Sequence, residues 1–237
     1  MAGQGAGKVA LITGVASMIG EATARLLATE GAHVALTAPP SVSARLDTLA
    51  TQIRDAGGQT LPLPADLGMR AQARALVRSV VDEWGRLDIL IVADGYDAAA
   101  DGGANGASAR PRLGQPHPAV RGLLHVATAA LPVMTRQGGG DIVAVAPVGS
   151  RVLRPERVAS ARLALEVAAL CDALRRQAGP RGVRVAVVEP GLTPGPNAGN
   201  PASPTAEDVA DAILFVLTQP PHVSINEILI QPTDQHA

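Results

Sequence analysis

The chain has 237 residues, of which 47% are hydrophobic, 17% are charged and only 1% are aromatic, and its formal net charge is −1. This length fits one α/β domain or two small ones, and the near-zero charge excludes the strongly basic character of most nucleic-acid-binding and membrane-surface proteins. The single cysteine, Cys171, excludes an internal disulfide. No apolar stretch reaches the length of a membrane span, and the N-terminus lacks a signal-peptide pattern, so we expect a cytoplasmic protein without nucleic-acid or membrane partners.

Short β-branched segments alternate with longer Ala- and Leu-rich segments, which is the pattern of a parallel sheet with crossover helices. We expect strands at Val9–Thr13, His33–Thr37, Thr60–Pro64, Ile89–Val92, Ile142–Ala146, Val183–Glu189 and Glu227–Ile230. We expect helices at Met18–Glu30, Val42–Ala56, Arg70–Trp84, Val120–Arg136, Glu156–Gln177 and Thr205–Leu217. The strands are apolar without alternation, as in sheets covered on both faces. The sequence therefore predicts a single doubly wound α/β domain.

Two segments interrupt this alternation. Residues 95–118 are rich in Gly, Ala, Asp and Pro, and residues 191–204 form a second Gly/Pro/Asn segment. Both fall inside the βα pattern, so they do not divide the chain into domains. We expect them to be variable loops that border a pocket.

A glycine-containing turn follows the first expected strand. The residues Thr13-Gly14-Val15-Ala16-Ser17-Met18-Ile19-Gly20 lead directly into an expected helix. In such a turn, backbone N–H groups and the helix dipole can bind a pyrophosphate. The motif resembles the T-G-x-x-x-G-I-G signature of the short-chain dehydrogenase/reductase family, with Met18 in place of the middle glycine. We expect a methionine at this position to crowd a dinucleotide.

Further segments extend this resemblance over almost the whole chain: Ala65-Asp66-Leu67, Gly85-Arg86-Leu87-Asp88, Leu131-Pro132-Val133-Met134, Val188-Glu189-Pro190-Gly191 and residues 219–227. The last resembles a subgroup of NADP-dependent hydroxy-acid dehydrogenases. The resemblance implies a Rossmann-type sheet in one domain over residues 1–237. It also implies a dinucleotide site at Gly14, Ile19, Gly20 and Asp66, and a homodimer or homotetramer interface built from the helices near 119–136 and 156–178.

The residues that carry redox chemistry in this family are missing. Family members use a Tyr, a Lys four residues later, a Ser and an Asn. This chain has one tyrosine, Tyr96, and one lysine, Lys8, which comes first. The pair therefore cannot form anywhere. Counting from neighbouring landmarks puts four other residues at the Tyr, Lys, Ser and Asn positions: Val158, Arg162, Pro147 and Ala119.

The cofactor positions are altered as well. The family's N-N-A-G after the fourth strand reads Val92-Ala93-Asp94-Gly95. After the second strand, Ala38-Pro39-Pro40-Ser41 offers no base for an NADP 2′-phosphate and no acid for an NAD ribose, although Arg45 could reach in from the following helix. We therefore expect the dinucleotide site to be vestigial and without a cofactor, with NADP or NAD binding as the alternative.

Three residues are candidates for new catalysis. Tyr96 follows the fourth strand at the edge where ligands of open α/β sheets bind, with Asp94 beside it as a possible base, although a loop tyrosine among solvated carboxylates is equally open. Arg162 keeps a permanent positive charge that could bind a carboxylate or stabilise an enolate, unless it simply pairs with Glu166 one turn on. His117 and His125 lack further ligands at metal-binding spacing, so we expect no metal.

These losses favour a non-redox enzyme of the cyclase, isomerase or lyase type that acts on a largely apolar small molecule, in natural-product biosynthesis. An apolar pocket can hold a substrate in a reactive conformation without a catalytic acid. Two alternatives stay open. One is a non-catalytic subunit in a hetero-oligomer with an active relative, and the other is an NAD(P)-dependent oxidoreductase.

Overall fold

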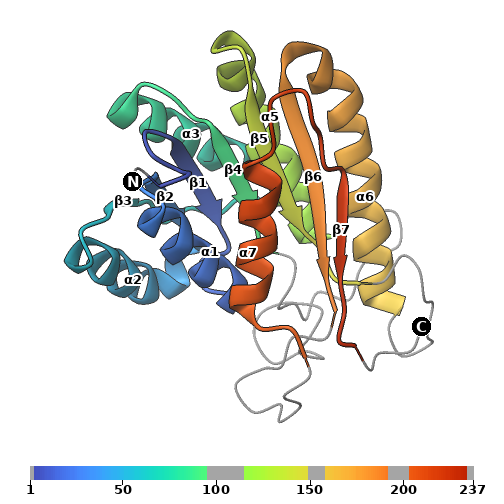
Figure 1. Cartoon of the computed structure of the whole chain (residues 1–237), viewed down its shortest axis with the longest axis horizontal. Coiled ribbons are helices and arrows are strands. Elements are labelled where there is room, and N and C mark those ends of the chain that lie inside the picture. Colours follow the sequence, from blue (N-terminus) through green and yellow to red (C-terminus); the bar gives the residue numbers. More distant parts are fainter. Residues whose placement is uncertain (1–2, 95–114, 149–157, 192–202, 234–237) are drawn as a thin grey trace.

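The computed structural model describes residues 3–94, 115–148, 158–191 and 203–233. Its centre is a seven-stranded parallel sheet with the order β3-β2-β1-β4-β5-β6-β7 (Figure 1). The strands are β1 (Val9–Thr13), β2 (His33–Thr37), β3 (Gln59–Pro62), β4 (Ile89–Val92), β5 (Gly140–Val145), β6 (Val183–Pro190) and β7 (Glu227–Ile230).

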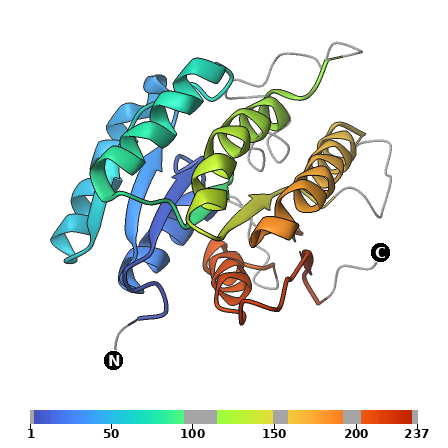
Figure 2. The same cartoon turned by 90° about the horizontal axis from the view of Figure 1, so that it is seen from above.

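Helices cover both faces of this sheet (Figure 2). One face packs against α1 (Met18–Thr29), α2 (Ser43–Asp55) and α7 (Ala206–Leu217). The other packs against α3 (Arg70–Trp84), α5 (Pro118–Arg136) and α6 (Val158–Ala178). Among the described residues, the 3-10 helices Pro40–Val42 and Gly179–Arg181 lie between the main elements. The prediction of a doubly wound α/β sheet is confirmed.

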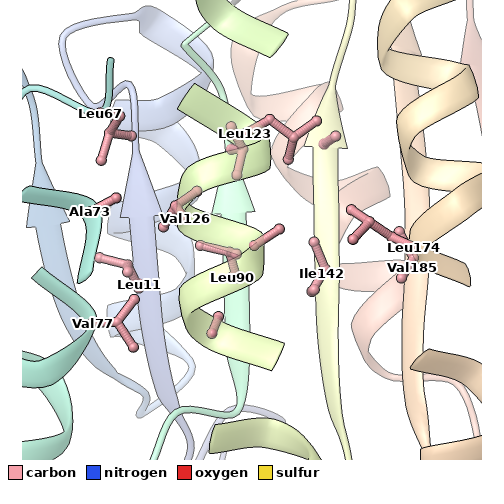
Figure 3. Close-up of a cluster of buried hydrophobic side chains, with 14 of the residues drawn as sticks. Leu11, Leu67, Ala73, Val77, Leu90, Leu123, Val126, Ile142, Leu174 and Val185 are labelled. Carbon is pink, nitrogen blue, oxygen red and sulfur yellow. The ribbon is translucent and has the colours of Figure 1, made fainter. Parts of the chain in front are cut away.

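The core is built from aliphatic side chains that alternate between the two faces of each strand. Leu11, Leu90 and Ile142 belong to the cluster that packs against α3, α5 and α6 (Figure 3). Ile12 and Ile91, their neighbours in sequence, belong to the cluster on the opposite face. Because the central strands β1, β2 and β4 are buried on both faces, they read as continuous apolar runs in the sequence.

Several boundaries match the expected ones, including those of β1, β2, β4, β7 and α3. A capping box starts α7, with Thr205 and Asp208 exchanging hydrogen bonds. By contrast, α5 begins at Pro118, two residues before its expected start. His117 caps it, because the His117 ring accepts a hydrogen bond from the N–H of Ala119, and proline is well suited to the first helical position.

Within the described ranges, no helix is both long enough and apolar enough to cross a membrane.

Candidate functional site

The carboxyl ends of β1, β2 and β4 meet at one edge of the sheet, where Thr13 is paired with Thr37 on one side and with Val92 on the other. We call this the carboxyl edge. Open parallel sheets bind ligands beyond this edge, close to the point where the strand order reverses. In this sheet the reversal lies between β1 and β4, because β2 and β3 are on one side of β1 and the later strands are on the other.

The turn between β1 and α1 depends on two glycines. Gly14 has a φ of 69°, and a Cβ atom there would lie 2.6 Å from the backbone nitrogen of Asp94. A Cβ atom on Gly20 would lie 2.3 Å from the carbonyl oxygen of Gly14. Both contacts are too short for a side chain, so only glycine allows the backbone of β1, α1 and the end of β4 to approach this closely.

The first turn of α1 leaves N–H groups available at this edge. The Ser17 hydroxyl accepts the N–H of Gly20 at 3.0 Å, while the N–H groups of Met18 and Ile19 lie in the turn where a helix has no intrahelical acceptors. The Ile19 side chain is 1% exposed and anchors this turn in the core. The partial positive charge of the helix start therefore faces the ligand edge, as an anion-binding turn requires.

Met18 occupies the position at which we expected crowding. Its side chain is 38% exposed. Methionine is unbranched and has three rotatable bonds, so it can move away from a bound phosphate more easily than a β-branched residue. The exposed, flexible Met18 side chain therefore does not by itself exclude a phosphate from this turn.

Asp94 follows β4 and lies beside this turn. Its Oδ2 atom accepts a hydrogen bond from the Thr13 hydroxyl at the end of β1. Burial raises the pKa of the Asp94 carboxyl group to about 6, although Thr13 and its own backbone N–H act in the opposite direction. The residue keeps part of its surface exposed. Sequence reasoning singled out Asp94 but missed its bond to Thr13.

Asp66 follows β3 on the same side of the sheet. It is exposed, and its Oδ1 atom accepts the N–H of Gly68 at 2.8 Å. Its own backbone N–H donates to the Gln72 side chain at 2.8 Å. Asp66 thus holds the turn before α3 in shape, and its second carboxylate oxygen can still accept a hydrogen bond from a ligand.

Arg162 belongs to a charged cluster between α5 and α6. Its Nε atom lies 2.6 Å from Glu166 Oε1, and its Nη2 atom donates to the carbonyl oxygen of Gln115. Glu166 Oε2 accepts the backbone N–H of His117 at 2.8 Å. The Arg162–Glu166 pairing that the sequence left open is therefore present, and it fastens the start of α5 to α6.

Burial and charge act together in this cluster. Burial lowers the pKa of His117, with Glu166 opposing the shift and Arg162 adding to it. For Glu166, burial would raise the pKa, but the His117 N–H and Arg162 outweigh burial, so the net shift is downward. At neutral pH, His117 is therefore neutral and Glu166 is ionised. Sequence reasoning had treated His117 only as a loop residue.

Tyr96 and the residues at the expected Ser and Asn positions contribute no further polar side chain to the described part of this site. Tyr96 lies outside the described residues, as does most of the two expected pocket loops. Pro147, at the expected Ser position, is buried, and Ala119, at the Asn position, packs against the core. Among the described residues, no group of three His, Cys, Asp or Glu side chains is placed to hold a metal ion.

A cleft of about 360 Å³ lies at the opposite edge of the sheet, where the strands begin. Its lining includes Lys8, Arg86, Asp88, Asp141 and Arg184. The last four form two ion pairs, Arg86 with Asp88 at 2.7 Å and Arg184 with Asp141 at 2.6 Å. Since these charges satisfy one another away from the turn and Asp94, we do not assign the functional site to this cleft.

Comparison with protein families places residues 8–204 in the short chain dehydrogenase family. Among curated proteins, an uncharacterized oxidoreductase of Staphylococcus aureus (strain USA300) is 30% identical over 231 residues, covering 95% of this chain and 97% of that protein. Glycine betaine reductase ATRR of Emericella nidulans is 32% identical over 248 residues. That match covers 97% of this chain but only 19% of the much longer reductase.

Solved structures give the same fold. A short-chain dehydrogenase/reductase from Burkholderia xenovorans, described as putative in its title, is 27% identical with a TM-score of 0.81, covering 98% of this chain and 97% of the other. A metagenomic short-chain oxidoreductase in complex with NADP is 24% identical with a TM-score of 0.79, covering 98% of this chain and all of the other.

These findings correct one expectation. We expected a non-redox cyclase, isomerase or lyase because the Tyr–Lys pair is absent. This expectation is wrong: the relatives that match along their whole length are named oxidoreductases, and the structural neighbours are dehydrogenases and oxidoreductases. The match over residues 8–204, the relatives and the sheet order agree, and the chain belongs to the short-chain dehydrogenase/reductase family.

Proposed function

We propose that this chain is an NAD(P)-dependent oxidoreductase that acts on a small carbonyl compound or the corresponding alcohol. The observation that carries this proposal is the turn between β1 and α1, where Gly14 and Gly20 allow close backbone approach and the start of α1 faces the ligand edge. The oxidoreductase names of the full-length relatives and the NADP bound to the metagenomic neighbour support it.

The residues of the turn would hold the cofactor. The first-turn N–H groups of α1 would bind the pyrophosphate, with Ser17 fixing the helix start. The exposed carboxylate of Asp66 is placed to accept a hydrogen bond from the adenine end. When bound, the dinucleotide supplies hydride transfer, and the chain's own residues must orient the substrate and move the proton.

The proton cannot move through the family's usual Tyr–Lys pair. Lys8, the only lysine, lines the cleft at the opposite edge of the sheet. Tyr96 is the only phenol and comes four residues after β4, so we propose it as the proton donor to the substrate oxygen. Arg162, near the start of α6, is already paired with Glu166, so we assign it no part in this proton transfer.

The specificity between NADP and NAD depends on the segment after β2. Ala38 is buried, and Pro39 and the 3-10 helix Pro40–Val42 bring no charge. The Arg45 side chain is 61% exposed, and its contact with Glu21 is long, at 3.8 Å. Arg45 is therefore free enough to turn toward a 2′-phosphate, which favours NADP.

Calorimetric titration of the whole chain with NADPH and NADP+ tests the proposal, and we expect dissociation constants in the micromolar range. Arg45→Gln should weaken NADPH binding by about tenfold, the loss expected for one exposed phosphate contact, and leave NADH binding unchanged. Arg54→Gln, in the last turn of the same helix, is the matched control. Absence of binding to NADPH, NADP+, NADH and NAD+ would refute the proposal.

That negative result would instead favour a second candidate, a non-catalytic subunit. Leu124 on α5 and Leu165 on α6 are 44% and 52% exposed, so the two helices present apolar side chains outward. We propose that these helices mediate association with a second copy or with an active family member. Co-expression and co-purification with such a relative would distinguish these two kinds of association. A stable homo-oligomer that does not bind the relative would exclude the subunit role.

A further inference from the structure

Asp94 places a carboxyl group directly beside the phosphate turn. The register of β1 and β4 pairs Thr13 with Val92, so the residues that follow these two strands emerge side by side. The Thr13 hydroxyl donates to Asp94 Oδ2, and the Cβ position of Gly14 lies 2.6 Å from the Asp94 nitrogen. The acid is thus attached to the turn both through a side chain and through the backbone.

A carboxylate is an unusual neighbour for a site that receives two phosphates. The groups that act on Asp94 are its burial, the Thr13 hydroxyl and its own backbone N–H; no charged side chain of the described residues contributes to its pKa. No described cation therefore compensates a negative charge at this position. An ionised carboxylate and a pyrophosphate a few ångströms apart repel each other, and partial burial strengthens the repulsion.

We propose that Asp94 is a contact of the dinucleotide and that the dinucleotide binds the chain when the Asp94 carboxyl group is neutral. This inference rests on the proposed function. In its neutral form the carboxyl group donates one hydrogen bond, which a phosphate or ribose oxygen can accept, while its other oxygen still accepts the Thr13 hydroxyl. In its ionised form it can only accept, and it opposes the phosphate charge.

Because the pKa of Asp94 is about 6, its carboxyl group changes from neutral to ionised within a pH range in which binding can be measured. If only the neutral form binds, the dissociation constant stays constant well below pH 6 and rises tenfold for each pH unit above it. Between pH 5 and pH 8, affinity should then fall by up to about 100-fold. A purely structural role, in which Asp94 only ties β4 to β1 through Thr13, gives no such dependence.

The test is calorimetric titration with NAD+ at pH 5 and pH 8. We choose NAD+ because the 2′-phosphate of NADP titrates near pH 6 itself and would hide the effect. The wild-type chain should lose at least tenfold in affinity between the two pH values. Asp94→Asn should bind NAD+ equally, within threefold, at both. Asp55→Asn, an exposed acid at the end of α2, should behave as the wild type.

Thr13→Val gives a second measurement that does not remove the acid. The Thr13 hydrogen bond lowers the pKa of Asp94, so its loss should move the midpoint of the affinity curve to higher pH. The inference is overturned if NAD+ binds the wild type equally at pH 5 and pH 8, or if Asp94→Asn keeps the pH dependence; in both cases the proposed function stands. Absence of binding of NAD+, NADH, NADP+ and NADPH at pH 5, with the fold confirmed by circular dichroism, overturns both.

Discussion

The two edges of the sheet treat their polar residues differently. We call the edge where the strands begin the amino edge. There the Asp88 carboxylate accepts the N–H of Val9 at 2.9 Å and pairs with Arg86. Arg184 pairs with Asp141 at the same edge. At the carboxyl edge, Asp94 shares one hydrogen bond with Thr13, and the buried Thr37 hydroxyl has no hydrogen-bond partner among the described residues.

This contrast between the two edges separates sequence motifs that stabilise the fold from motifs that are available to bind a ligand. The Gly85-Arg86-Leu87-Asp88 landmark is explained by bonds within the protein, so it says nothing about activity. The groups at the carboxyl edge retain hydrogen-bonding capacity that folding does not use. The presence of a cleft where the strands begin is therefore not by itself evidence of function.

The largest effect should come from Gly14→Ala at the carboxyl edge. The substitution combines a left-handed backbone with a contact of 2.6 Å to the end of β4, so we expect a loss of about 3 kcal/mol in the free energy of unfolding, together with loss of dinucleotide binding. Gly57→Ala is the matched control: its φ is 88°, but a Cβ atom there has open space. It should cost about 1 kcal/mol and leave binding intact. Urea unfolding and NADPH titration measure both variants, and equal losses of stability would contradict the close approach.

A smaller effect should follow from Arg184→Met at the amino edge. Arg184 binds Asp141 and four carbonyl oxygens, those of Leu217, Gln219, Pro220 and Val223. Because both partners of the ion pair are less than a fifth exposed, we expect a loss of about 2–3 kcal/mol in the free energy of unfolding, with unchanged dinucleotide affinity. Arg176→Met, whose side chain is 71% exposed, should cost about 0.5 kcal/mol or less. A change in the NADPH affinity of Arg184→Met would contradict the view that the amino edge serves stability and not dinucleotide binding.

The smallest effect should come from Thr37→Val. The hydroxyl of Thr37 is buried without a partner among the described residues, so a valine of the same shape should raise the free energy of unfolding by about 1 kcal/mol. Thr23→Val is the control, because the buried Thr23 hydroxyl donates to the Ile19 carbonyl at 2.7 Å and should not gain from removal. If Thr37→Val is destabilised instead, the hydroxyl has a partner that the described residues do not provide.

Much of the fold follows from local patterns. Buried strands such as Ile89–Val92 are short apolar runs, and α3 carries a helical stripe that ends at Gly85 in a left-handed conformation. β3 was harder to place, because its residues are exposed or only partly buried, and it runs from Gln59 to Pro62 instead of from Thr60 to Pro64.

Less of the site could be predicted. The turn at Gly14 and Gly20 is a local motif, and its position between β1 and α1 agrees with the prediction. The Thr13–Asp94 bond joins residues far apart in sequence and requires the pairing of β1 with β4, which the sequence alone does not give. The same holds for Glu166, whose second oxygen reaches His117 on another helix. The sequence does lack the Tyr–Lys pair. The absence of that pair did not justify the expectation that redox function is lost.

Arg184 has a further consequence for how the molecule opens. Its guanidinium group, on β6, holds the end of α7 and the residues that lead to β7. Opening this end of the chain breaks several charge-assisted bonds at once, so α7 and the segment leading to β7 should exchange their amide hydrogens as one cooperative unit with β6. Arg184 of β6 thereby limits the fraying expected of the edge strand β7.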